Sequence, residues 1–176
     1  MHIMVDFETL DTKPTAVVLS VGMVLFDENK IRGYRYFKFD VQTQLDAGRT
    51  VSAKTLAWWT NQSEKAREVL SPHVTDITLV TFNDELTMWL LDRGVRVEDT
   101  HVWGNGADFD LPILNSITDE FGPIYDHWNS WCFRTFNKMT NCKHLAIRQG
   151  THHNALDDAM YQAECVLAYW EKQRSK

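Results

Sequence analysis

The chain has 176 residues, of which 44% are hydrophobic and 12% aromatic, and its formal net charge at pH 7 is −6. This composition supplies enough apolar side chains for a packed core, which excludes an intrinsically disordered chain and favours a single domain covering residues 1–176. The sequence has no run of about 20 apolar residues, no signal-peptide pattern at its start and no paired cysteine motif, so we expect a cytoplasmic protein without membrane-spanning segments.

The N-terminal part of the chain is predicted to form three β-strands. Residues 3–8 alternate between apolar and polar side chains, residues 16–26 are rich in β-branched side chains, and residues 31–39 alternate again. A polar turn is expected at residues 27–30, between the second and third strands. Because these connections are short, the three strands are predicted to form an antiparallel meander.

The remaining sequence is predicted to be mainly helical. Two helices are expected in residues 52–70, separated near residue 60, and further helices are expected at residues 83–93, 109–121 and 155–174. A fourth, buried strand is predicted at residues 101–103. A meander followed by alternating helices and strands is typical of a mixed α/β sheet.

The stretch from residue 127 to residue 156 differs from the acidic average of the chain. It contains no Asp or Glu, and it carries four Lys or Arg residues, including Arg134, together with four histidines, two tryptophans and two phenylalanines. Positive charge beside flat rings is the composition expected of a groove that binds a single nucleic-acid strand. An ordinary surface loop with some core aromatics is the alternative, and the sequence leaves it open.

The first candidate site is the pair Asp6 and Glu8. Side chains two residues apart on a strand share a face, so both carboxylates are expected to point to one side, away from Val5 and Phe7. Two like charges on an otherwise apolar strand repel each other unless a cation lies between them, and hard ions such as Mg²⁺ or Mn²⁺ prefer oxygen ligands. A solvated strand face is the alternative.

A second acidic candidate lies in residues 104–110, between the predicted fourth strand and the following helix. Asp108 and Asp110 are both candidates there, and Asp108 is also suited to be an N-cap. The glycines of this turn allow other backbone segments to approach closely.

The third candidate is the start of the last helix. Asn154 is a good N-cap residue, which makes Asp157 the third residue of the helix, a position where a carboxylate suits the helix dipole. We therefore prefer Asp158, together with His153, as the functional pair. The pair His152 and Asp157 has the same spacing, so this alternative stays open.

In combination, these motifs resemble those of the DEDDh 3′→5′ exonuclease superfamily, in which a DxE motif, a central Asp and a late H-x₄-D motif occur in this order. Residues 54–67 and 133–135 are similar to the phage exonuclease A (DexA-type) group, and the small bacterial 3′→5′ exoribonucleases are related to it. One departure is that Asn105 and Gly106 stand where many relatives have a His-Asn pair.

The resemblance implies a ribonuclease H-like fold, with a mixed five-stranded sheet flanked by helices and the active site at its edge. It implies that two divalent ions, Mg²⁺ or Mn²⁺, are held by four carboxylates while His153 acts as the general base. Nucleoside 5′-monophosphates would then be released from the 3′ end of single-stranded DNA or RNA. Several relatives are homodimers, and a non-catalytic nucleic-acid-binding module is the alternative function. The implied metal ligands are Asp6, Glu8, Asp110 and Asp158.

Five further residues are candidates for substrate binding. Thr9 and Leu10 follow the acidic pair and, as in similar enzymes, are expected to hold the terminal nucleotide, with Leu10 as a wedge under its base. Trp58 and Trp59 are candidates for stacking on bases, although paired tryptophans on a helix also suit a core. Arg134 is a candidate for binding a phosphate, with a surface salt bridge as the alternative.

Overall fold

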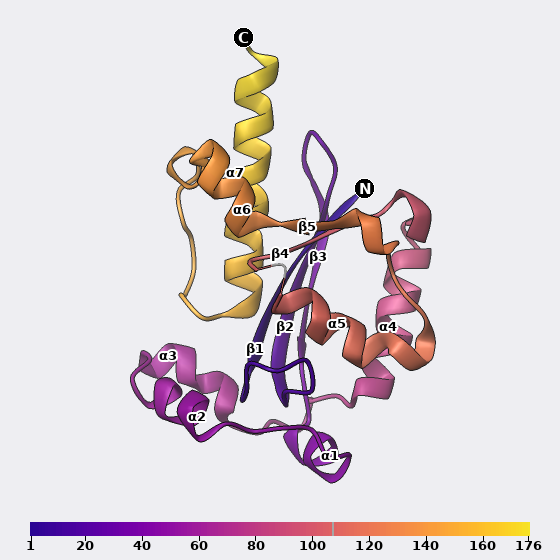
Figure 1. Cartoon of the computed structure of the whole chain (residues 1–176), viewed down its shortest axis with the longest axis vertical. Coiled ribbons are helices and arrows are strands. Elements are labelled where there is room, and N and C mark those ends of the chain that lie inside the picture. The colour runs from indigo at the N-terminus through magenta and orange to yellow at the C-terminus, as the bar shows by residue number, and fades with distance from the viewer. Residues whose placement is uncertain (107) are drawn as a thin grey trace.

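The computed structural model describes residues 1–106 and 108–176, apart from the side chain of residue 120 (Figure 1). Its centre is a five-stranded sheet with the strand order β3-β2-β1-β4-β5. The first three strands are antiparallel, whereas β4 is parallel to β1 and β5 is parallel to β4. The strands are β1 (His2–Thr9), β2 (Val18–Phe26), β3 (Ile31–Lys38), β4 (His101–Gly104) and β5 (Ser130–Cys132).

This architecture confirms the expected meander and the mixed α/β sheet. The second strand begins two residues later than predicted, because Ala16 forms only an isolated bridge with Thr50. The short strand β5 was not located by the sequence patterns, since three residues are too few to show an alternation.

The described helices agree with the predictions in the middle and at the end of the chain, with two additions. Helices α2 and α3 occupy the region where two helices are expected, α4 begins four residues earlier than expected, and α1 and α6 are additional. Short 3₁₀ turns follow or connect several of these helices. The α-helices are α1 (Val41–Asp46), α2 (Ala53–Thr60), α3 (Glu64–Arg67), α4 (Leu79–Leu91), α5 (Asp110–Thr118), α6 (Phe133–Thr140) and α7 (Ala155–Arg174).

Helices cover both faces of the sheet, and the alternation along β1 decides which residues face which layer. Ile3, Val5 and Phe7 pack in a core with α4 and α5. Met4 faces the opposite core, which is closed mainly by α7. Figure 1 shows α7 on one side of the sheet and α4 and α5 on the other. The even-numbered positions of β1, including Asp6 and Glu8, therefore face the side on which α7 lies.

Within the part of the chain that the structure describes, none of the helices combines the length and apolarity that a membrane crossing requires.

Candidate active site

Three carboxylates meet where the first turn of α7 lies against β1. Asp6 and Glu8 come from the strand, and Asp158 is the fourth residue of the helix. One oxygen from each of these side chains lies within 4.8 Å of the others. Glu8 and Asp158 are buried, while Asp6 keeps partial exposure toward the cleft. Residues more than 150 positions apart in the chain thus form one acidic cluster.

Gly22 allows α7 to approach this closely. It lies beside Asp6 in the β1–β2 register, and a Cβ atom built on it would be 2.2 Å from the backbone oxygen of Ala155. A side chain at this position would push the first turn of α7 off the sheet. The absence of a side chain therefore brings Asp158 within reach of the strand carboxylates.

Asp110, the first residue of α5, is the fourth buried carboxylate of the cleft. Its Oδ1 accepts a hydrogen bond from the backbone N–H of Phe7 at 3.1 Å, and its Oδ2 accepts one from the N–H of Asn105 at 2.8 Å. These bonds fix the carboxyl group between β1 and the loop after β4. Asp108 is exposed, and the N-cap position is occupied by Phe109, so the N-cap interpretation of Asp108 is wrong. Ala107 lies outside the described residues.

Burial raises the pKa values of three of these acids, and repulsion by neighbouring carboxylates raises the pKa values of two of them further. Burial raises the pKa of Asp6 well above its usual value, and the charges of Asp110, Glu8 and Asp158 raise it further. Burial, with the charges of Asp158 and Asp110, raises the pKa of Glu8 to about 8. Burial raises the pKa of Asp110 to about 7, although the backbone bonds from Phe7 and Asn105 lower it. The ionised cluster therefore requires compensating positive charge.

Gln162 is a site residue that the sequence reasoning missed. It follows Asp158 by one helical turn, is buried, and donates a hydrogen bond from Nε2 to Oδ1 of Asp6 at 2.8 Å. Its Oε1 has no hydrogen-bond partner among the described residues. Its position four residues after Asp158, on the same face of α7, is the signal that would have found it. It therefore holds one carboxylate oxygen of Asp6 in position at the wall of the cleft.

The loop before α7 distinguishes the two His–Asp pairs. Oδ2 of Asp157 accepts a hydrogen bond from the backbone N–H of Thr151 at 2.6 Å and lies against Gly150, so Asp157 holds the loop. Oδ2 of Asp158 instead accepts one from the N–H of His153 at 2.9 Å. The geometry thus assigns a structural role to Asp157 and favours Asp158 as the residue that faces the strand acids.

His153 lies beside Asp158 at the edge of the cleft. Its backbone is left-handed, with φ 63°, and its ring contacts that of Trp58 edge to face, with centroids 4.8 Å apart. Burial lowers the pKa of His153, and the charges of His152 and Arg148 lower it further, against the opposing effect of Asp158. The imidazole is therefore neutral at cellular pH and able to accept a proton. His152 is exposed, although ligand atoms of His152, His153 and Asp158 also lie within 4.8 Å of one another.

Arg148 brings a positive charge directly to the acidic cluster. Its guanidinium forms a salt bridge with Oδ1 of Asp158 and lies over the ring of Tyr161, 4.4 Å from its centroid. Arg148 is one of the four Lys or Arg residues in the basic stretch from residue 127 to residue 156, but the sequence does not indicate its contact with Asp158. In this structure the guanidinium balances part of the charge that the buried carboxylates carry.

The cleft that contains these groups has a volume of about 540 Å³. Thr9, Trp58 and Arg134 line it, as expected of substrate-binding residues. Arg134 donates a hydrogen bond to the backbone oxygen of Asn105 at 2.7 Å and lies close to Gly106. No salt bridge of Arg134 occurs among the described residues.

Two expected substrate contacts are wrong. Trp59 is 1% exposed, and its indole nitrogen donates a hydrogen bond to the backbone oxygen of Thr9 at 2.9 Å. Leu10 is buried in the same small core as Trp59. Neither side chain lines the cleft, so neither stacks on a base or wedges beneath one, whereas Trp58 is 40% exposed and faces the cleft.

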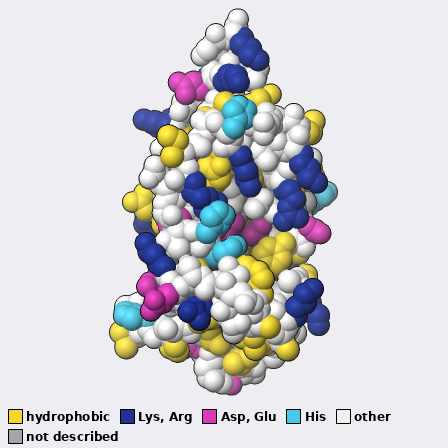
Figure 2. Space-filling model, turned by 90° about the vertical axis from the view of Figure 1, so that its left-hand side faces the viewer, with side chains coloured by type: hydrophobic (Ala, Val, Ile, Leu, Met, Phe, Trp, Pro, Cys, Tyr) yellow, Lys and Arg dark blue, Asp and Glu magenta, His cyan; other side chains and the backbone are white. Residues whose placement is uncertain are grey.

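In the basic stretch of residues 127–156, the side chains that line the cleft are those of cationic residues and histidines. Arg134, Lys143 and Arg148 line the cleft, as do His152 and His153. The aromatic residues have other positions: Phe133 is buried and Phe136 packs against the same core. Figure 2 shows a hollowed face in which Lys or Arg side chains surround histidines and acidic side chains. Phe133 and Phe136 thus stabilise a core, whereas Trp128 and Trp131 are exposed but are not among the residues that line the cleft.

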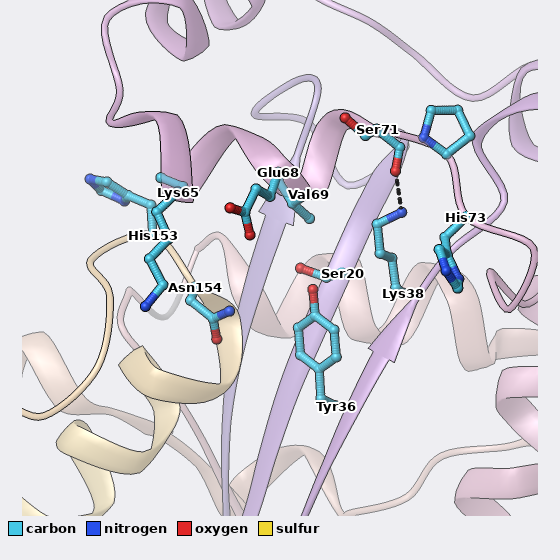
Figure 3. Close-up of a pocket in the computed structure, with 12 residues that line it drawn as sticks. Ser20, Tyr36, Lys38, Lys65, Glu68, Val69, Ser71, His73, His153 and Asn154 are labelled. Atoms are coloured by element: carbon cyan, nitrogen blue, oxygen red, sulfur yellow. Dashed lines mark hydrogen bonds between the residues drawn. The ribbon is translucent and has the colours of Figure 1, made fainter.

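A second cavity of about 330 Å³ lies on the other side of His153, which lines both spaces. Figure 3 shows its polar lining, with the hydroxyl groups of Ser20 and Tyr36 facing Glu68 across the opening. Lys38 forms another part of the wall and donates a hydrogen bond to the backbone oxygen of Ser71 at 2.7 Å.

Comparison with known proteins adds to this geometry. A family model described as the 3′-5′ exoribonuclease Rv2179c-like domain matches residues 1–170. An exodeoxyribonuclease of Enterobacteria phage T4 is 30% identical over 124 residues, which cover 62% of this chain and 52% of that protein. The chain thus spans about half the length of this curated relative.

Solved structures of nucleases share the fold. The nuclease domain of the DEDDh family member 3′hExo, bound to rAMP, has a TM-score of 0.63 at 12% identity, covering 97% of this chain and 92% of that one. A full-length 3′-exonuclease has a TM-score of 0.58 at 12% identity, covering 98% and 82%. The cell-death related nuclease CRN-4 has a TM-score of 0.54 at 16% identity, covering 94% and 62%. At these identities the likeness concerns the fold.

Proposed function

The chain belongs to the Rv2179c-like 3′-5′ exoribonuclease domain family of DEDDh exonucleases, which makes it a metal-dependent nuclease, and on this premise we propose that it removes nucleotides one at a time from the 3′ end of a single strand. The observation that supports this most is the convergence of four buried or half-buried carboxylates from β1, α5 and α7 around one cleft, beside the neutral imidazole of His153.

The donor set fits a pair of divalent cations. Asp6, Glu8 and Asp158 place oxygens within 4.8 Å of one another, and Asp110 completes the cleft. The raised pKa values of Asp6 and Glu8 reflect charges that hard cations would compensate. Asp6, whose pKa responds to all three of the other acids, is the proposed carboxylate shared by both ions. When bound, two Mg²⁺ or Mn²⁺ ions would supply Lewis acidity at the scissile phosphate and neutralise the charge that develops there.

His153 acts as the general base in this proposal. It accepts a proton from the attacking water while the water oxygen forms a bond to phosphorus. The bond between phosphorus and the 3′-oxygen of the preceding nucleotide breaks, and that oxygen takes a proton from solvent. The products are a nucleoside 5′-monophosphate and a strand shortened by one nucleotide. The hydrogen bond from the backbone N–H of His153 to Asp158 keeps the imidazole beside the acids.

The terminal nucleoside is proposed to lie against Trp58 and Thr9. The exposed indole of Trp58 offers a flat apolar surface for a base. Thr9 lies at the end of the strand that carries Asp6 and Glu8 and lines the cleft, which supports its proposed position beside the phosphate to be cleaved. The matched family is described by a ribonuclease activity and the phage relative by a deoxyribonuclease activity, so we propose single-stranded DNA or RNA as the substrate.

A homodimer in the cytoplasm is a further part of the proposal. The buried thiols of Cys142 and Cys165 agree with a reducing compartment. Light scattering coupled to size-exclusion chromatography tests the dimer, because a monomer has a mass of 20.5 kDa.

The proposed activity is tested with two 5′-labelled oligomers of one sequence, one of DNA and one of RNA, in Mg²⁺ or Mn²⁺. We expect products that shorten one nucleotide at a time from the 3′ end, release of nucleoside 5′-monophosphates, and inhibition by a chelator. Asp84→Asn, on an exposed position of α4, is the matched control for Asp6→Asn. Strand binding without shortening of either oligomer would refute the proposal and support a non-catalytic binding module.

A further inference from the structure

The two sides of the cleft differ in chemistry. One side, which we name the α2 wall, consists of Thr9, Lys54, Thr55 and Trp58. The opposite side, which we name the basic wall, consists of Arg134 on α6, Lys143 in the following 3₁₀ turn, and Arg148 in the loop before α7. The α2 wall offers hydroxyl groups, an exposed indole and one cation, Lys54, whereas the basic wall offers three cations.

The contacts that hold the basic wall in place leave Arg134 and Lys143 without a salt bridge among the described residues. Arg134 is anchored by its bond to the backbone oxygen of Asn105. The hydroxyl of Tyr161 donates a hydrogen bond to the backbone oxygen of Lys143 at 3.0 Å, and its ring lies under Arg148. No Asp or Glu occurs in residues 127–156, so the sequence supplies no local carboxylate that would neutralise these cations. Asp158, from α7, is the carboxylate that contacts Arg148.

His153 indicates the side from which water attacks. Its ring contacts Trp58 of the α2 wall, and it also lines the polar second cavity shown in Figure 3. In an in-line displacement the leaving 3′-oxygen departs on the side of phosphorus opposite the attacking water. The nucleotide that bears this oxygen, and all nucleotides upstream of it, must therefore extend away from the α2 wall.

We propose that the basic wall is the binding site for the phosphates upstream of the cleaved bond, with Arg134 and Lys143 as its principal phosphate ligands. This proposal rests on the proposed function and adds a direction: the strand enters along α6 and the following 3₁₀ turn, and its 3′-terminal nucleoside reaches the α2 wall. Phosphates attract such cations without regard to sequence, which suits an enzyme that shortens any single strand.

The test compares two substrates that differ in upstream phosphates. The dinucleotide d(TpT) contains only the phosphate that is cleaved, whereas the octamer of thymidine contains six more upstream; uridine counterparts serve if RNA is hydrolysed faster. Lys143→Ala is expected to lower kcat/KM for the octamer about tenfold more than for the dinucleotide, the effect of one lost charged hydrogen bond. Lys138→Ala, on α6 but outside the cleft lining, is the matched control.

A binding measurement supports the kinetic one. In the Asp6→Asn background, the affinity for a fluorescent octamer is measured by anisotropy at several salt concentrations. Lys143→Ala and Arg134→Ala are each expected to reduce the slope of log affinity against log salt by about 0.7, the value of one phosphate contact on a single strand. Because Arg134 also supports the loop at Asn105, Arg134→Lys is included, and it is expected to retain the salt slope.

Equal losses on the two substrates for Lys143→Ala, or an unchanged salt slope, would overturn the proposal. A length-dependent loss in Lys54→Ala would place the upstream strand on the α2 wall and would overturn it as well. Hydrolysis of neither substrate by the unmodified protein would be a failure of the proposed function itself, which keeps the two results distinct.

Discussion

The acidic cluster and the loop that carries the histidines are positioned in different ways. Asp6 and Glu8 stand on a strand that is paired on both sides, and Asp110 begins a helix directly after a second strand. His153 and Arg148 lie in the segment between η5 (Cys142–Leu145) and α7, which is held by side chains bonded to backbone groups. Asp6, Glu8 and Asp110 are thus positioned by the sheet, whereas His153, the proposed base, is positioned by a loop that depends on α7.

Asp158 is the residue that connects the acidic cluster to the loop before α7. Its Oδ2 accepts a hydrogen bond from the backbone of His153, its Oδ1 pairs with Arg148, and its carboxyl group lies beside Asp6 and Glu8. Changes on the sheet side should therefore remove the cation site, whereas changes on the loop side should leave the cation site and remove proton transfer.

The largest effect is expected for Asp6→Asn. The substitution removes the carboxylate that interacts with all three other acids, so activity should fall by more than about 10²-fold, comparable to the loss of a main electrostatic contributor. The fold should be retained, because an amide of the same shape is still able to meet Gln162. Full activity with unchanged circular dichroism would remove Asp6 from the site.

A nearly equal effect is expected for Gly22→Ala. The new Cβ would meet the backbone of Ala155 and displace α7, which separates Asp158 from the strand. We expect destabilisation of about 1–3 kcal/mol, as for other overpacked positions, and a large loss of activity. Gly33→Ala is the matched control, because a Cβ there would meet the flexible side chain of Arg93 at 3.2 Å and the Trp89 ring at an ordinary contact distance of 3.8 Å. Thermal unfolding and nuclease assays check both variants, and equal behaviour of the two would contradict this account.

His153→Ala should lower kcat by about 10²-fold while leaving Mn²⁺ affinity nearly unchanged. Burial lowers the pKa of His153 below its ordinary value of 6.5, so the imidazole is a proton acceptor at neutral pH. Activity of the unmodified enzyme should therefore fall only as pH drops through a value below 6.5, where His153 becomes protonated. An unaffected kcat in His153→Ala, with loss in His152→Ala, would transfer the base to His152.

The metal-free protein should become less stable as pH rises. The pKa of Glu8 is raised from 4.5 to about 8, so its folded form holds a proton that the unfolded form releases. The stability from this group is fully present below pH 4.5 and is lost as pH rises to about 8. Melting temperatures measured without metal should fall across this window, and saturating Mn²⁺ should flatten the profile. Parallel profiles with and without Mn²⁺ would argue against a cation beside Glu8.

The smallest effect is expected for Arg148→Gln. Its salt bridge with Asp158 competes with a cation for the same oxygen, so its removal should tighten Mn²⁺ binding by about 2–5-fold, the value of one partly exposed ion pair. Isothermal titration measures this change directly. Weaker Mn²⁺ binding would mean that Arg148 supports the cation site instead of competing with it.

The sequence predicted the parts of the molecule that follow a regular backbone period. The two-residue period of β1 placed Asp6 and Glu8 on one face. The prediction of Asn154 as the N-cap correctly placed Asp157 in the first turn of the last helix. The whole meander and the mixed sheet followed from similar patterns. These features depend on local geometry, which a sequence expresses directly.

The sequence did not predict features that depend on long-range packing. Gln162 meets Asp6 across 156 positions, and Gly22 is required only because α7 returns to β2. Trp58 and Trp59 are adjacent and chemically identical, yet one faces the cleft and the other is buried, because α2 turns one of them toward β1. The sequence of a short helix does not indicate which of its faces will be buried against neighbouring elements.

The bond from the indole of Trp59 to the carbonyl of Thr9 has a mechanical consequence. It fastens α2 to the end of the strand that carries two of the acids, so these two elements behave as one body. In the proposed reaction cycle, any widening of the cleft is therefore expected on the other side, where residues 146–154 connect η5 to α7 without regular structure. The surface proposed to receive the terminal base would then keep its alignment from one cycle to the next.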